Sequence, residues 1–284
     1  TIDGAVKTAS VMAEPYEGVL RHQFRGGNVL VPLMLDQHRE DLGTQAVTQE
    51  LHKAVNASRA HLSQRSARVS VAEETGEDGA LLLDVTVENL AGHKLPTAYP
   101  SRRAWLHVVV RDGNGEAVFE SGALRADGSI AGNDNDADET RYEPHHTQIT
   151  APDQVQIYEA ILAAPDGAVT TGLLTASGYA KDNRVLPAGF DKATARAEVA
   201  VHGTAAADAA FKAGTHRTRY AVDVSGSQGP YEVTAELWYQ PVGFRWAQGL
   251  AGLGYREPTR FVEAYQANAG ESAVLLAQAG SPSP

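Results

Sequence analysis

From residue 67 onward, apolar and polar residues alternate along the chain, and this period of two constrains the fold more than any other feature. Residues 68–71 and 81–88 alternate on either side of a Gly/Asp-rich turn at 76–79, which is typical of a β-hairpin. A second hairpin is predicted over 105–120, where Asp112-Gly113-Asn114-Gly115 supplies a turn that favours tight strand reversal.

Further strands are predicted over residues 155–160, 197–201, 219–224 and 231–239. Loops, and not the helices that parallel strands need for their crossovers, separate these strands. We therefore expect a mainly β fold, an antiparallel Ig-like β-sandwich.

Two stretches have helical spacing instead. Apolar residues recur every three or four positions over 48–65, after Thr44 as a candidate N-cap, and again over 258–278. These patterns predict an N-terminal arm and helix over 1–66, a sandwich with long loops over 67–257, and a C-terminal helix and tail over 258–284.

The composition excludes several classes of function. The chain has no cysteine, so it cannot form disulfides, thiolate metal sites or thioether-linked haem. A formal net charge of −11 argues against binding to nucleic acid. No run of about 20 apolar residues predicts a transmembrane segment. Because the sequence opens on Thr1, we expect a mature or partial chain from which any signal peptide has been removed.

An acidic run suggests a calcium site. The candidate ligands are Asn133, Asp134, Asp136 and Asp138, which lie one or two residues apart in a loop. Calcium takes six to eight oxygen ligands in irregular geometry, so such a loop could bind Ca²⁺. The alternative is a solvated acidic turn held by side-chain to backbone hydrogen bonds.

Several histidines lie beside glycine or proline in loops, where a fixed imidazole could bind a transition metal or haem iron. They are His22, His93 and the pair His145 and His146. Spacing alone favours ordinary hydrogen bonding for each of these histidines. A further histidine, His216, is predicted to lie in a turn. No motif of a nucleophile, phosphate loop or zinc protease is present, although carboxylates such as Glu159 and Asp182 could meet in space.

Longer motifs give these histidines a context. The sequence His-Gln-Phe-Arg-Gly-Gly-Asn at 22–28 and the stretch 92–105 resemble the C-terminal, haem-less β-rich portion of a family of exported bacterial multihaem c-type cytochromes. The stretches 132–136, 154–159, 179–187 and 238–241 resemble it too. Together they span most of the chain.

The resemblance implies a non-catalytic β-domain or subunit in extracytoplasmic electron transfer, periplasmic or at the cell surface. Its partner would be a multihaem cytochrome domain or subunit that holds haem c. His22 is the leading candidate for a distal axial ligand and His93 the second, but the Cys-x-x-Cys-His motif of the family is absent here. The alternatives are a calcium-stabilised secreted module that binds carbohydrate or protein, and an unrecognised enzyme.

Overall fold

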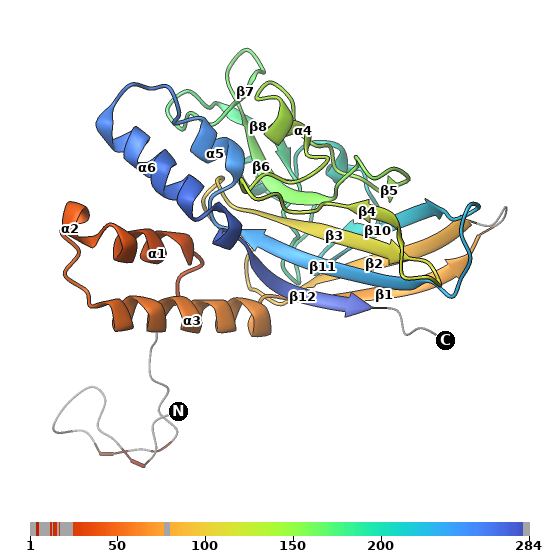
Figure 1. The fold of residues 1–284 in the computed structure, drawn as a ribbon, viewed down its shortest axis with the longest axis horizontal. Coiled ribbons are helices and arrows are strands. Elements are labelled where there is room, and N and C mark those ends of the chain that lie inside the picture. Colours follow the sequence, from red (N-terminus) through yellow and green to blue (C-terminus); the bar gives the residue numbers. More distant parts are fainter. Residues whose placement is uncertain are drawn as a thin grey trace.

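In the computed structural model, two β-sheets pack face to face and helices gather at one end (Figure 1). The structure describes residues 25–76 and 80–280, together with residues 4, 5, 12, 14, 15 and 17. All strand pairs but the parallel pair of β5 with β10 are antiparallel in this part of the chain.

The first sheet has the order β1-β2-β10-β5, with β9 paired to β10. Its strands are β1 (Ala67–Thr75), β2 (Ala80–Asn89), β5 (Gln148–Ile149), β9 (Phe211–Lys212) and β10 (Thr215–Asp223). The second sheet has the order β12-β11-β3-β6-β7, with β4 paired to β3 and β8 to β6. Its strands are β3 (Arg103–Arg111), β4 (Ala117–Ser121), β6 (Ile157–Ala163), β7 (Val169–Thr170), β8 (Gly178–Asp182), β11 (Glu232–Gln240) and β12 (Val274–Gly280).

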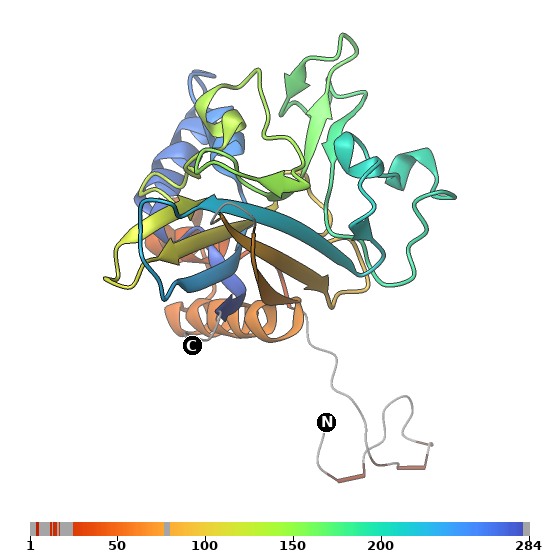
Figure 2. The ribbon, with the colours of Figure 1, turned by 90° about the vertical axis from the view of Figure 1, so that its right-hand side faces the viewer.

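The main hydrophobic core lies between these sheets. Along β2, the buried residues Leu83, Val85 and Val87 alternate with residues that are partly exposed, as a period of two requires when one face is covered. They belong to one core cluster with Leu106 of β3 and Tyr220 of β10, both fully buried. Figure 2 shows the sandwich from the end opposite to the N-terminal helices. The predicted β-sandwich is therefore confirmed.

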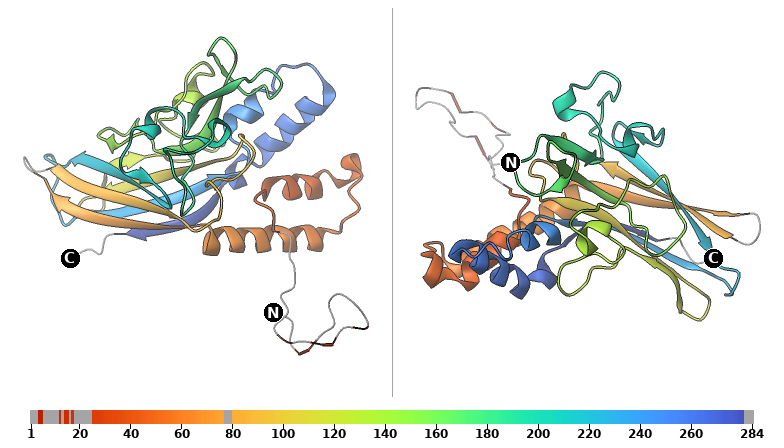
Figure 3. Two further views of the ribbon diagram at one scale, coloured as in Figure 1. Left: turned by 180° about the vertical axis from the view of Figure 1, so that it is seen from behind. Right: turned by 90° about the horizontal axis from the view of Figure 1, so that it is seen from above.

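The N-terminal helices lie at one end of the sandwich, and the helices from the C-terminal part of the chain lie above them in the view of Figure 1. Helix α1 lies between α3 and α6 (Figures 1 and 3). They are α1 (Leu30–Gln37), α2 (Arg39–Leu42), α3 (Thr48–Arg65), α5 (Phe244–Gln248) and α6 (Arg256–Ala267). Helix α3 packs on β12. The remaining short elements are α4 (Asp134–Ala137), η2 (Ala197–Val199), η3 (Thr204–Ala206) and η4 (Ala269–Glu271).

Three predictions about the type or bounds of these elements are wrong. Residues 197–201 contain a 3₁₀ turn where a strand was expected. Helix α6 ends at Ala267, and Val274–Gly280 is a strand because pairing with β11 outweighs the apolar spacing. The N-cap position of α3 is Val47; the Thr44 hydroxyl instead donates to the Leu35 carbonyl at 3.1 Å.

Candidate functional site

The arm motif and the stretch that contains His93 meet in space. His22 lies outside the described residues, but the end of its motif is placed. The Gly27 carbonyl accepts a hydrogen bond from the Tyr239 hydroxyl at 2.7 Å. A Cβ on Gly27 would lie 3.2 Å from that hydroxyl and 3.5 Å from the Arg102 guanidinium, which explains a glycine here. Asn28 then caps α1, because its Oδ1 accepts from the amides of Leu30 and Val31.

A buried asparagine, Asn89, holds the loop between β2 and β3, residues 90–102. Asn89 Nδ2 donates to the carbonyls of His93 and Val185 at 2.8 and 2.9 Å, and its Oδ1 accepts from the Ala91 amide. Leu95 and Val185 exchange two backbone hydrogen bonds, each 2.8 Å long. The backbone on both sides of His93 is therefore fixed by the body of the domain.

A buried ion cluster holds the same loop from the other side. Asp182, 1% exposed, accepts from Lys94 Nζ at 2.7 Å and from Arg184 Nη2 at 2.7 Å. Arg184 also reaches the Ala98 carbonyl at 3.2 Å. Although burial raises the pKa of Asp182, the two cations outweigh it and hold this pKa below its usual value. Asp182 thus joins β8 to the loop and has no free acid or base role.

The imidazole of His93 takes no part in the contacts that hold its loop. It is exposed, and within the described residues it forms neither a hydrogen bond nor an ion pair. Lone-pair donation to a metal or a haem iron requires such a free ring nitrogen. Hence the anchored loop presents the His93 imidazole to solvent, and its role as a ligand stays a prediction.

The four residues of the predicted calcium site do not form a common ligand set. Asp136 is buried, with one oxygen on Arg103 at 2.7 Å and the other on the Ile130 amide at 2.8 Å. Asp134 pairs with Arg141 at 2.6 Å, and Asp138 accepts from the amide and hydroxyl of Thr140.

Asn133 fits a cation no better in this arrangement. Its Oδ1 accepts from the Asn135 amide, and its buried Nδ2, a donor, has no partner among the residues that the structure describes. A donor is the wrong polarity to face Ca²⁺. Calcium binding here would require Asp134 and Asp138 to turn and Arg103 to release Asp136, and it stays a prediction.

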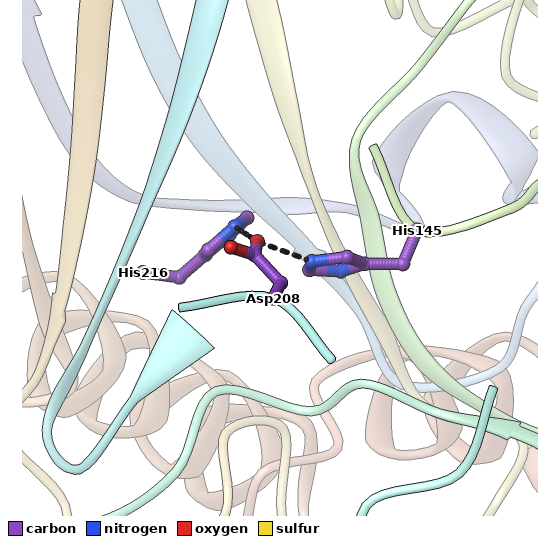
Figure 4. Close-up of side chains that lie close together, drawn as sticks. All are labelled: His145, Asp208 and His216. Atoms are coloured by element: carbon purple, nitrogen blue, oxygen red, sulfur yellow. Dashed lines mark hydrogen bonds and ion pairs between the residues drawn. The ribbon is translucent and has the colours of Figure 1, made fainter. Parts of the chain in front are cut away.

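A different group of residues does converge, deep in the domain. His145, Asp208 and His216 place one ligand atom each within 4.8 Å of one another, the one such group of histidine and acidic residues in the part of the chain that the structure describes. Asp208 Oδ2 lies 3.0 Å from His145 Nε2 and 3.2 Å from His216 Nε2, between the two rings (Figure 4). We call these three residues the buried His–Asp–His cluster.

The amides around His145 fix which of its nitrogens carries the proton. Gln156 accepts from the His146 amide through Oε1, so its Nε2 points at His145 Nδ1, 3.2 Å away. Asn183 accepts from the Glu159 amide through Oδ1 and likewise points Nδ2 at His145 Nδ1, at 3.1 Å. Two donors therefore face Nδ1, which must accept, and the proton sits on Nε2 and is donated to Asp208.

This tautomer disfavours a metal ion in the buried His–Asp–His cluster. A metal bound at His145 Nε2 would move the proton to Nδ1, where two N–H groups already point and no acceptor among the described residues faces it. His216 is satisfied as well, since its Nδ1 accepts from the Tyr158 hydroxyl at 2.9 Å. Every ring nitrogen in the cluster has a partner without a metal.

The electrostatics agree with two neutral rings around one carboxylate. Burial, together with the neighbouring His216, lowers the pKa of His145 to about 3. Burial lowers the pKa of His216 in the same direction. Burial alone would raise the pKa of Asp208, but hydrogen bonds from His216, His145 and the Ala210 amide keep it well below its usual value.

The cluster joins the segment before β5 to two later segments, one of which carries Asp208 63 residues after His145. His145 precedes β5, His216 lies in β10, and Asp208 lies in the long connection between β8 and β9. Phe211 packs edge-on against both rings, at 5.2 and 5.3 Å between centroids. His216 and Tyr158 are fully buried, and the cluster fastens the connection onto the sandwich.

Sequence reasoning missed this cluster. His145 was among the loop histidines, but Asp208 was not a candidate, and the expected turn at His216 is wrong because the residue lies within a strand. The alternation Thr215 to Asp223 does put His216 on the buried face with Thr218 and Tyr220, and that was the available signal. Glu159 does not pair with Asp182; it pairs with the buried Lys181 at 3.0 Å.

Comparisons with known proteins identify no family. No family model and no curated protein matches the chain. Among solved structures, a penta-heme cytochrome c552 from Thermochromatium tepidum is similar, with a TM-score of 0.44 and 17% sequence identity. The match covers 87% of this chain and 49% of the cytochrome, so the chain spans about half the length of that protein. A similarity of this degree assigns the chain to no family.

The described helices give no sign of a membrane span. Across the residues that the structure places, no helix is both long and apolar enough to cross a bilayer.

Proposed function

We propose that this chain is a non-catalytic β-domain or subunit that associates with a multihaem c-type cytochrome in extracytoplasmic electron transfer, in the periplasm or at the cell surface. On this proposal the haem c is held by the partner. His93 and His22 are the candidate residues for a distal axial ligand to one of its iron atoms.

The observation that carries the proposal is the meeting of the two motifs that resemble the cytochrome family. The motif at 22–28 ends against the stretch 92–105 through Gly27, which contacts Tyr239 and lies beside Arg102. Motifs that serve one surface should lie together in the fold, whereas unrelated resemblances have no reason to do so.

The state of His93 supports the ligand role. Its imidazole is exposed and bonds to no residue that the structure describes, while Asn89 and Asp182 hold the backbone around it from two sides. A backbone that is already fixed loses little conformational freedom when the ring binds, and this favours ligation. The buried His–Asp–His cluster, by contrast, is part of the packed interior of the domain.

A haem c peptide with one bound histidine and an open sixth coordination position is a direct probe. Titrating it with the purified protein should convert the iron to the low-spin, two-histidine state, and the visible spectrum reports this. The His93→Ala and His22→Ala variants should each weaken the conversion severalfold. His61→Ala is the matched control, because His61 is exposed on α3 and also lacks a partner among the described residues.

Two results would count against the proposal. Equal titration curves for the wild type, His93→Ala and His22→Ala would remove the ligand role. Purification of the native protein without any haem-bearing partner, judged by absorbance and by cross-linking, would remove the association itself.

A further inference from the structure

A groove remains open between the N-terminal helices and α6. At its base, Leu30 and Met34 of α1 pack against Ala264 and Tyr265 of α6 in a small core of their own. Above this contact the helices separate around a cavity of ≈ 340 Å³. The order of α1 and α6 in the helical end of the molecule can be followed in Figures 1 and 3.

Both walls of this groove present helical stripes of apolar side chains. On α1, Val31, Met34 and Leu35 line the cavity at the spacing i, i+3, i+4. On α6, Phe261 and Ala264 do the same, three residues apart. Leu42 of α2 also lines the cavity and is 47% exposed, although it is a large apolar side chain, and the polar His38 lies in the lining beside it. Two helices with facing apolar stripes form the kind of surface that receives a third helix.

The rim of the groove is acidic. Three carboxylates, Asp41, Glu257 and Glu263, border it against one guanidinium, Arg260, which is 3.5 Å from Asp41. Glu257 and Glu263 are exposed and form no ion pair with any residue that the structure describes. Unpaired carboxylates beside an apolar groove complement a cationic partner and repel an acidic one.

From these features we infer that the α1–α6 groove docks a basic amphipathic α-helix of a partner protein. The apolar face of that helix lies on the stripes of α1 and α6, and its lysine or arginine side chains lie beside Glu257 and Glu263. This inference does not depend on haem. Either proposal can fail while the other stands, because the groove residues and the candidate axial histidines are different.

A synthetic helix tests the inference. The probe is a fluorescein-labelled peptide of leucine and lysine, about 18 residues long so that it can form a stable helix on binding. We expect the fluorescence anisotropy to rise on addition of the full chain and the affinity to fall as salt is added. The Glu257→Lys/Glu263→Lys variant should bind about tenfold more weakly, and Leu42→Asp should also lose affinity.

Matched variants keep this test specific. Glu116→Lys/Glu232→Lys makes the same change of charge at exposed glutamates far from the groove, and Leu174→Asp matches Leu42→Asp. Both should bind as the wild type does. Equal losses in the groove variants and their controls would overturn the inference, as would equal binding of a scrambled peptide or of a leucine–glutamate peptide. Self-association that Leu42→Asp abolishes, measured by sedimentation, would assign the groove to a second copy and overturn the inference as well.

Discussion

His93 and His145 both lie in loops anchored by asparagine side chains, yet their imidazoles have opposite surroundings. The Asn89 amide holds the backbone at His93 and leaves the ring exposed. The Asn183 amide points at the ring of His145 itself, which is 7% exposed and donates to Asp208. Anchoring the backbone leaves a ring free to act on a partner, whereas bonding both ring nitrogens makes the ring a structural element.

We expect the largest effect on stability, and so the strongest test of this contrast, from substitutions of Asp208. In Asp208→Ala, the buried Nε2–H groups of His145 and His216 both lose their acceptor, and we expect unfolding to become easier by about 3–5 kcal/mol. Asp208→Asn keeps one oxygen and should lose less. Urea unfolding at pH 7.5 measures both changes.

Asp191→Asn is the control for these variants, because Asp191 is an exposed aspartate in the same connection, where it caps Ala193 and Thr194. Its unfolding midpoint should match that of the wild type. If Asp208→Ala were as stable as this control, the cluster would not be what fastens the connection.

The pH dependence of stability is the second test. His145 is neutral in the folded protein down to a pKa of about 3, whereas in the unfolded chain it takes up a proton below about 6.5. The unfolded state therefore binds more protons in this window, so stability is complete above pH 6.5 and falls as the pH is lowered towards 3. The expected loss from His145 alone is about 3 kcal/mol at pH 4.5.

Neighbouring charges do not reverse this sign. Lys181 lowers the pKa of His145, and Lys192 and Arg217 lower that of His216, so these cations also oppose protonation of the rings. His145→Gln should flatten the curve between pH 7.5 and 4.5 when urea unfolding is measured at each pH. Parallel curves for the wild type and His145→Gln would show that the ring is not buried in its neutral form.

The loop at 133–138 combines both kinds of surroundings. One of its carboxylates is buried against Arg103, and two others lie near solvent. If it binds Ca²⁺, added calcium should raise the thermal midpoint by several degrees relative to a chelator, because only the folded state is stabilised. Asp134→Asn/Asp138→Asn should remove that difference, while Asp191→Asn should keep it. An unchanged midpoint in the wild type would end the calcium prediction.

The sequence predicted the sandwich and missed the cluster for one physical reason. Alternation is local, so the hairpin of β1 and β2 and the helix over 48–65 were visible in short windows. The cluster depends on which loops fold back together, and His145, Asp208 and His216 are separated by 63 and 8 residues. Strand β12 was missed for the same reason, since only its partner β11 makes it a strand.

The smallest effect on stability, and the sharpest form of the contrast, is expected at His93. Because its ring contacts no described residue through a hydrogen bond or ion pair, His93→Ala should change the free energy of unfolding by less than about 0.5 kcal/mol. In the haem-peptide titration the same variant should bind more weakly. His145→Ala should show the reverse: a loss of about 2–4 kcal/mol in stability, with unchanged ligation of the haem peptide at a temperature where it is still folded. If His145→Ala also weakened ligation, the two histidines would act on one site, and if His93→Ala lost stability, its ring would be part of the structure after all.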